Sequence, residues 1–151
     1  MPFYDFNKDF PIARETEKEV ANILRDYGAK ILDFEDTNKY DILAEKDGSK
    51  FTVEVKEDFI CENTGNVGLE FECRGKPSGI QTSKATFYVY KLHTRNYGIK
   101  FFMHKTGALK KMIAEEKYFR IVNGGDEGSD SMNYLFKYDT FIKGAFELIK
   151  K

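Results

Sequence analysis

A tight turn between two alternating segments restricts the fold of this chain more than any other feature. The segments KYDILAE (39–45) and KFTVEVKE (50–57) flank the turn KDGS (46–49). An Asp-Gly pair in this setting favours a β-hairpin, because hairpin turns need residues that tolerate positive φ angles. The sequence therefore predicts two antiparallel strands that pair directly across this turn.

The second strand of this hairpin carries charged residues on one face. Phe51, Val53 and Val55 alternate as the apolar face of a half-buried strand. Glu54 and Lys56 share the other face, since successive side chains of a strand point to opposite sides. Two interpretations are open: a solvated charge pair that forms a mild salt bridge, or a strand that ends in an active site.

The other periodic segments predict an α/β fold with a mixed central sheet and helices at both ends of the chain. Residues 12–27 have an apolar stripe of helical spacing, and Gly28 is a natural C-terminal stop. The pattern predicts further strands at 29–35, 67–73, 85–92, 99–105 and 119–125, loops at 36–38 and 125–131, a helix at 108–118, and a strand followed by a closing helix over 134–151.

Length and composition are those of one soluble domain spanning residues 1–151. The chain is 41% hydrophobic and 32% charged, and it has no apolar run of the roughly 18–20 residues that cross a membrane. Its first ten residues lack a basic region followed by an apolar stretch, so we expect no secretory signal. Cys61 and Cys73 have neither CxxC spacing nor nearby histidines, which favours reduced structural thiols over a zinc site. These features predict a cytoplasmic protein without a membrane partner.

The net charge of −1 conceals two oppositely charged parts of the sequence. Residues 1–73 hold 9 Lys and Arg against 18 Asp and Glu, whereas residues 74–120 hold 11 against 2. Such segregation can give one surface that collects cations and another that collects phosphates. The alternative is that the two sets neutralise each other in the folded protein.

The predicted hairpin brings two carboxylates together. Counted back from the turn, Asp41 faces positions 54–55, so Asp41 and Glu54 become cross-strand neighbours. Two adjacent carboxylates repel each other unless a cation is present, and they suit Mg²⁺, a hard ion that prefers oxygen ligands. Lys56 projects to the same side, where it can orient a water or stabilise charge on an attacked phosphate. Phosphodiester hydrolysis needs these components.

Asp41, a gap of 12 residues and the E-x-K of 54–56 together resemble the motif of PD-(D/E)XK nucleases, the restriction-endonuclease-like superfamily. That family places a helix before its core hairpin, often with a glutamate aimed at the metals. The helix of this chain, with EKEV at 17–20, is most similar to that of archaeal-type Holliday-junction resolvases. Tyr40 stands where the motif has proline, and residues 60–83 do not match the resolvases' loop.

This resemblance implies both a fold and an activity. The fold would be a restriction-endonuclease-like α/β core, with a mixed central sheet and flanking helices. The activity would be metal-dependent hydrolysis of DNA phosphodiester bonds, by an endonuclease selective for junctions, flaps or branched DNA. A homodimer is expected as well, because cutting two strands needs two sites.

The resemblance also implies roles for individual residues. Asp41 and Glu54 would bind Mg²⁺, with Mn²⁺ as a substitute, and the main-chain carbonyl of Val55 would be a third ligand. Lys56 would act on the attacking water or on the phosphate. The carboxylate from the helix would be Glu17, with Glu15 and Glu19 as alternatives.

A glycine- and lysine-rich stretch, GKPSGIQTSKATFYVY (75–90), predicts contacts to nucleic acid. Arg74, Lys76 and Lys84 are expected to contact the phosphate backbone beside the metal site. Gln81 and Lys84 lie in the zone where several such nucleases have an accessory glutamine or lysine. The alternative is that this stretch is a simple helix cap and turn.

Other functions stay open on the sequence alone. Glu70 and Glu72 share one face of their predicted strand, and they either add to the acidic site or form salt bridges with the basic segment. A non-catalytic module that binds nucleic acid or a partner protein would keep the fold and bind DNA without Mg²⁺. An RNA-directed nuclease would use the same residues on a different substrate.

Overall fold

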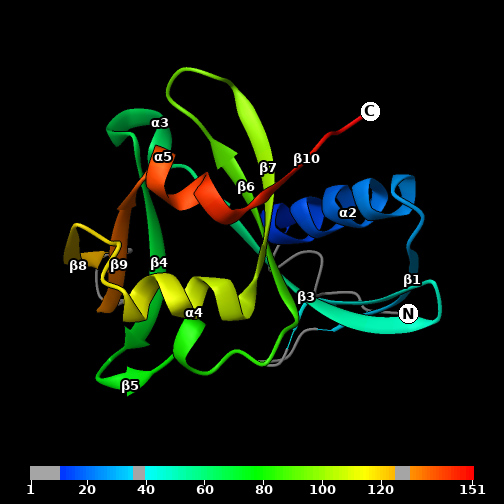
Figure 1. Cartoon of the computed structure of the whole chain (residues 1–151), viewed down its shortest axis with the longest axis horizontal. Helices are drawn as coiled ribbons and strands as arrows, with labels where there is room; N and C mark the ends of the chain where they lie inside the picture. The colour runs from blue at the N-terminus through cyan, green and yellow to red at the C-terminus, as the bar shows by residue number, and fades with distance from the viewer. Residues whose placement is uncertain (1–10, 36–39, 125–129) are drawn as a thin grey trace.

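A six-stranded mixed sheet runs through the computed structural model, which describes residues 11–35, 40–124 and 130–151. The order of strands is β1-β2-β3-β6-β7-β10 (Figure 1). β3 and β6 are parallel, and the other neighbouring pairs are antiparallel. The strands are β1 (Lys30–Phe34), β2 (Ile42–Lys46), β3 (Ser49–Asp58), β6 (Phe87–His93), β7 (Ile99–Lys105) and β10 (Phe146–Leu148).

A second, antiparallel sheet of four strands within the same described ranges was not predicted from the sequence. Two of its strands lie in the crossover between β3 and β6, because parallel strands cannot be joined by a tight turn. The crossover also contains two short helical segments. In strand order the sheet is β5 (Lys76–Pro77), β4 (Asn66–Cys73), β9 (Ser131–Lys137) and β8 (Arg120–Gly124), and the helical segments are α3 (Cys61–Thr64) and η1 (Gly79–Gln81).

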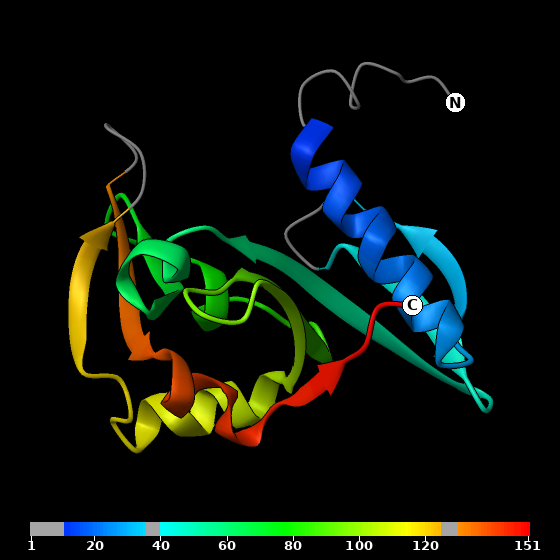
Figure 2. The same cartoon turned by 90° about the horizontal axis from the view of Figure 1, so that it is seen from above.

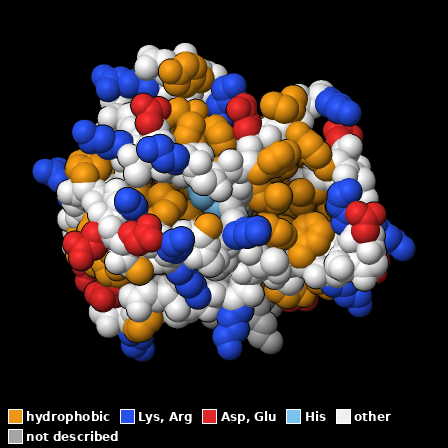
Figure 3. Space-filling view, viewed as in Figure 1, with side chains coloured by type: hydrophobic (Ala, Val, Ile, Leu, Met, Phe, Trp, Pro, Cys, Tyr) orange, Lys and Arg blue, Asp and Glu red, His pale blue; other side chains and the backbone are white. Residues whose placement is uncertain are grey.

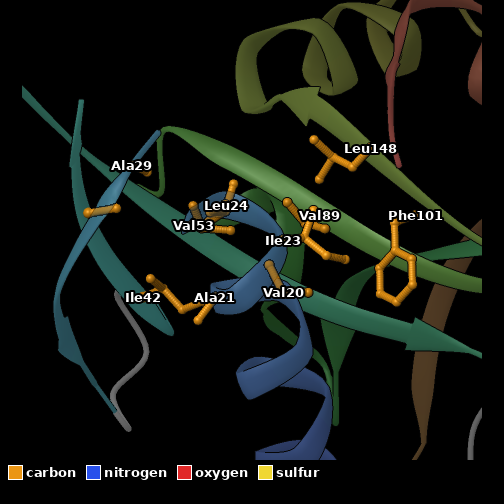
Figure 4. Close-up of a cluster of buried hydrophobic side chains, with 11 residues drawn as sticks. Val20, Ala21, Ile23, Leu24, Ala29, Ile42, Val53, Val89, Phe101 and Leu148 are labelled. Carbon is orange, nitrogen blue, oxygen red and sulfur yellow. The ribbon is translucent and has the colours of Figure 1, made fainter. Parts of the chain in front are cut away.

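The helix α2 (Pro11–Asp26) covers one face of the six-stranded sheet. Figure 4 shows Val20, Ile23 and Leu24 of α2 among the side chains of Val53 and Val89, which come from β3 and β6. All five are nearly inaccessible to solvent. Their burial follows from the helical spacing of the apolar residues in α2 and the strand alternation in β3.

The opposite face of the six-stranded sheet packs on a second core. Tyr88, Tyr90 and Leu92 of β6 enter this core together with Val67 and Phe136 of the second sheet. Figure 2 shows the second sheet and α4 (Thr106–Ala114) on one side of the molecule and α2 on the other. β6 is therefore buried on both faces, as expected for the centre of a layered α/β fold.

Most of the predicted elements are present, but the predicted closing helix is wrong. After β9 the chain forms the four-residue helix α5 (Tyr138–Phe141), the turn η2 (Ile142–Gly144) and then β10. Pairing with β7 overrides the helical tendency of this segment, because Leu148 is buried in the core and β10 satisfies the edge of β7. The predicted loops at 36–38 and 125–131 fall largely outside the described residues.

An apolar groove of about 580 Å³ opens beside α2. Leu24, Tyr27, Phe51, Met103 and Phe146 are among its lining residues. Figure 3 shows hydrophobic side chains gathered on the part of this face that α2, β3 and β10 occupy in Figure 1.

None of the described helices is long and apolar enough to cross a bilayer.

Gly79 is predicted to be essential for the close packing of η1 against β4. Its φ is 53°, and an added Cβ would overlap the main-chain oxygen of Glu70. We expect Gly79→Ala to lower the free energy of unfolding by about 2 kcal/mol or more, because backbone strain and the clash act together. Gly107→Ala in α4 is the control, since its added Cβ meets no atom within 4 Å and alanine favours helix. Urea unfolding measures the difference, and equal stabilities would contradict this packing.

Candidate functional site

The β2–β3 hairpin sets the position of Asp41, which directly precedes β2. Residues 47–48 form its two-residue turn with φ angles of 52° and 82°, as a type I′ turn requires. The register pairs Ile42 with Val53, so Asp41 lies beside Glu54. The Asp41 amide also donates to the Val53 carbonyl at 2.9 Å. The cross-strand proximity expected from the sequence is confirmed.

A hydrogen bond holds the Asp41 side chain against β3. Its Oδ2 accepts from the main-chain N–H of Val55 at 2.7 Å. Val55 stands between Glu54 and Lys56, so the Asp41 carboxylate is fixed next to the strand segment that carries both side chains. Val55, whose carbonyl is the predicted third metal ligand, thus contacts Asp41 through its main-chain amide.

Burial makes both acids harder to ionise, and for Asp41 neighbouring carboxylates add to this effect. The pKa of Asp41 rises from 3.8 to about 7, because of burial first and then the charges of Glu54 and Glu17, against the opposing effects of Val55 and Lys56. Burial also raises the pKa of Glu54, against the opposing effect of Lys56. A cation bound between the carboxylates would relieve this repulsion.

Lys56 completes this group on β3. Its Nζ lies 3.5 Å from Oε2 of Glu54, which makes the contact an ion pair rather than a short hydrogen bond. The Lys56 side chain is 38% exposed and that of Glu54 is 18% exposed, so the ammonium reaches past the carboxylate toward solvent. The salt bridge considered in the sequence analysis is therefore present, and it lies in the wall of a pocket.

This pocket has a volume of about 510 Å³. Glu54 and Lys56 form part of its wall, and residues 77–79 and 82–84 of the crossover form another part. Lys84, one of the predicted nucleic-acid contacts, is in this second part. The pocket thus combines acidic groups with two lysines, a combination suited to a phosphate group that arrives with a metal ion.

Glu70 of β4 brings a further carboxylate to the same pocket. The Ser78 hydroxyl donates to its Oε2 at 2.8 Å, which fixes the side chain. A register shift in β4 between Glu70 and Glu72 interrupts the alternation that the sequence suggests, and Glu72 is not among the lining residues. Glu70 therefore adds to the acidic site, whereas Glu72 does not.

Tyr88 is a site residue that the sequence analysis missed. The parallel register places it next to Glu54, and it lines the pocket although it is only 1% exposed. Burial raises its pKa to about 12, against an opposing effect of the nearby Ser83 hydroxyl. The Tyr88 hydroxyl lies near the hydroxyl of Ser83, but it makes no well-formed hydrogen bond among the described residues. It is a buried donor that a ligand in the pocket can satisfy.

Of the three candidate glutamates in α2, Glu17 is the one that acts on Asp41. It is 9% exposed, and its charge contributes to the raised pKa of Asp41. Glu15 is exposed. Glu19 forms ion pairs with Lys91 and Lys150, which occupy its carboxylate.

A separate charged network fastens α2 to the sheet. The Thr16 hydroxyl donates to Oε1 of Glu57 at 2.6 Å. The other oxygen of Glu57 lies 2.8 Å from Nε2 of His93 and 3.7 Å from Nζ of Lys91. Strand alternation puts Glu57 on the α2 side of β3, away from Glu54. Because Thr16 directly precedes Glu17, this network sets the point at which α2 approaches Asp41.

The remaining predicted nucleic-acid contacts lie outside the pocket lining. Arg74 is exposed in the turn between β4 and β5, and Lys76 is exposed on β5. Gln81 donates from Nε2 to the Phe71 carbonyl at 3.0 Å, which anchors η1 to β4. This contact gives Gln81 a structural role.

The described oxygen ligands fit Mg²⁺ but form a small set. In residues 11–35, 40–124 and 130–151, no three His, Cys, Asp or Glu side chains are grouped to hold a metal ion. Mg²⁺ needs one or two carboxylates, because waters and substrate phosphates complete its octahedral shell. Asp41, Glu54 and the Val55 carbonyl meet this requirement, and ligands of oxygen alone favour Mg²⁺ or Mn²⁺ over zinc.

Comparison of the sequence with protein-family models and with curated proteins gives no match.

The raised pKa of Asp41 predicts a pH-dependent effect of Asp41→Asn in EDTA. The pKa of Asp41 is higher in the folded protein than in the unfolded chain. The contribution of Asp41 to the free energy of unfolding is therefore full below about pH 4 and is lost as the pH rises through 7. Asparagine does not titrate and can still accept from Val55. At pH 8 we expect the variant to be more stable by about 1–3 kcal/mol, with the gain shrinking toward pH 4.

Guanidinium unfolding at pH 4.5, 6 and 8 measures this effect. Asp47→Asn is the control, because Asp47 is exposed in the hairpin turn. A gain for Asp41→Asn that does not change with pH would show that Asp41 ionises freely in the folded protein.

Proposed function

We propose that the protein is a Mg²⁺-dependent nuclease with a restriction-endonuclease-like core that hydrolyses phosphodiester bonds in DNA. One observation carries the proposal: Asp41 and Glu54 lie side by side on paired strands, and Lys56 stands next to them in a pocket wall. The helix that precedes the hairpin and the mixed central sheet agree with that core. Burial, together with the charges of Glu54 and Glu17, raises the pKa of Asp41, and a cation bound beside these carboxylates would favour the ionised form, which supports a cation site.

In this proposal the chemistry is divided between Glu54 and Lys56, which line the pocket, and three neighbouring residues that do not line it, Asp41, Val55 and Glu17. Asp41, Glu54 and the Val55 carbonyl hold Mg²⁺, which supplies charge stabilisation at the phosphate and a more acidic bound water. Glu17 would help to organise the metal shell, because its negative charge near Asp41 adds to the attraction of the site for a cation. Lys56 orients the attacking water or stabilises charge on the phosphate.

Tyr88 and Lys84 would position the substrate in this pocket. The Tyr88 hydroxyl, which makes no well-formed hydrogen bond among the described residues, can donate to a phosphate oxygen. Lys84 faces the same pocket and can contact a neighbouring phosphate. Recognition of this kind reads the shape of the backbone rather than bases, which suits junctions, flaps and other branched DNA. We expect a homodimer when both strands are cut.

A non-catalytic nucleic-acid-binding module is the second candidate. The observation that favours it is the small ligand set, since no three metal-ligating side chains are grouped in the described part of the chain. Such a module would bind DNA equally well in Mg²⁺ and in EDTA. Incubation of plasmid, branched DNA and RNA with the protein in Mg²⁺, Mn²⁺ or EDTA separates the two candidates and identifies the substrate.

Lys56→Ala is expected to reduce cleavage without reducing DNA binding. The loss should be about 100-fold or more in the single-turnover rate, because a contact made in the transition state is removed. DNA affinity should change little, since one phosphate contact among several is lost. Lys50→Ala is the matched control, because Lys50 is an exposed lysine on the same strand.

Three outcomes of this comparison are informative. A slow Lys56→Ala protein that still binds DNA supports the catalytic role. Wild-type cleavage by Lys56→Ala rules that role out. Equal losses in Lys50→Ala and Lys56→Ala would mean that only the general positive charge of β3 matters.

The basic residues of the crossover are expected to control the salt dependence of DNA binding. Replacing Arg74, Lys76 and Lys84 together with glutamine should lower the slope of log affinity against log salt by about two to three, since each phosphate contact contributes about 0.9. Lys84→Gln alone should also slow cleavage, because Lys84 lines the pocket whereas the other two do not. Fluorescence titrations from 50 to 300 mM salt provide the measurement, and an unchanged slope would place these residues away from DNA.

A further inference from the structure

A second pocket lies near the other end of β4. It has a volume of about 370 Å³ and is lined by α3, the β6–β7 loop and the junction of β9 with α5. β4 contributes Asn66 to this pocket and Glu70 to the pocket of Glu54 and Lys56. Four residues of strand, about 13 Å, separate these two contributions.

Tyr97 gives the second pocket an aromatic surface. Tyr97 is 60% exposed, so a ligand in the pocket can reach its ring. The ring stacks on Tyr138, with centroids 5.9 Å apart and planes inclined by 28°. Tyr138 supports the ring from one side, and nucleic-acid bases stack on such rings whatever their sequence.

The loop that presents Tyr97 is held in place by its own hydrogen bonds. The Thr94 amide and hydroxyl both donate to the Gly98 carbonyl, at 2.9 and 2.6 Å. The Tyr97 amide donates to the Thr94 hydroxyl at 2.9 Å. Gly98 closes the loop with a φ of 71°. A ligand therefore meets a preformed surface, which reduces the entropic cost of binding.

The charge and polarity of the residues that line the second pocket are suited to binding a nucleotide. Arg95 and Lys137 supply two cations, and Asp139 is the single acidic residue among the lining residues, all of which the structure describes. Asn66 and Asn96 add side-chain amides that can pair with base edges. A stacking ring beside cations is the usual composition of a site for single-stranded nucleic acid.

We propose that this pocket binds an unpaired nucleotide of single-stranded DNA, with the base on Tyr97 and its phosphate near Arg95 and Lys137. The place of this site in catalysis rests on the proposed function: a strand bound here would continue along β4 to Glu54 and Lys56. An unpaired flank held in this way would direct cleavage to branched or flapped DNA. Binding itself needs no metal and no cleavage.

The test measures binding of a fluorescently labelled 15-nucleotide oligo(dT) to the whole protein in EDTA by anisotropy. Tyr97→Ala should weaken binding about tenfold or more, because the stacking surface is lost. Tyr97→Phe keeps the ring and should bind as wild type does. Phe146→Ala is the matched control, since Phe146 is 53% exposed but lies in the apolar groove beside α2. Arg95→Gln should lower the salt slope by about one.

Each outcome decides the inference. Wild-type oligonucleotide affinity in Tyr97→Ala overturns it. If Tyr97→Ala leaves oligonucleotide binding intact but abolishes self-association in sedimentation, the pocket is a protein interface and the inference is also overturned. Tyr97-dependent binding without any cleavage in Mg²⁺ upholds the inference and removes the proposed nuclease function, so the two failures are distinguishable.

Discussion

The parallel pairing of β3 with β6 is the contact on which the remaining structure depends. Parallel neighbours need a long connection, so the chain leaves the sheet after β3 and builds α3, β4, β5 and η1 before it returns as β6. The connection lays β4 over β6, where the Tyr90 hydroxyl donates to the Gly68 carbonyl at 3.0 Å. Both pockets are lined by residues of this connection, so both follow from the same pairing of strands.

Local signals explain which parts of the site could be predicted from the sequence. The Asp-Gly turn and the alternation of β3 determine the hairpin register over a few residues, and that register brings Asp41 to Glu54. Tyr88 reaches Glu54 through pairing of strands far apart in the sequence, and Glu70 reaches the pocket because the crossover lays β4 over β6. No short-range pattern encodes either contact. The second sheet escaped prediction for the same reason, because it joins β4 to the distant β9.

Where the sequence pattern allowed more than one outcome, tertiary contacts decided which structure forms. The last residues of the chain have helical character, but β7 offers an edge and the core takes up Leu148, so a short strand forms there. The three glutamates of α2 could not be ranked by spacing alone. Once Thr16 is bonded to Glu57 and Glu19 to Lys91, the phase of the helix leaves Glu17 as the residue that acts on Asp41.

A comparison of Glu19 with Asp41 distinguishes a carboxylate with a structural role from a candidate metal ligand. Burial acts on Glu19 as the largest single influence and favours its neutral form, yet Lys150 and Lys91 outweigh it and the pKa of Glu19 falls. Asp41 is also partly buried, but its strongest charged neighbour is the carboxylate of Glu54, and its pKa rises to about 7. The Val55 amide and Lys56 offset the charge of Asp41 only in part, whereas two lysines pair with Glu19, so an ionised Asp41 retains an energetic cost. The cost remains at the position where Glu54, Lys56 and a pocket meet, and a cation bound there would remove it.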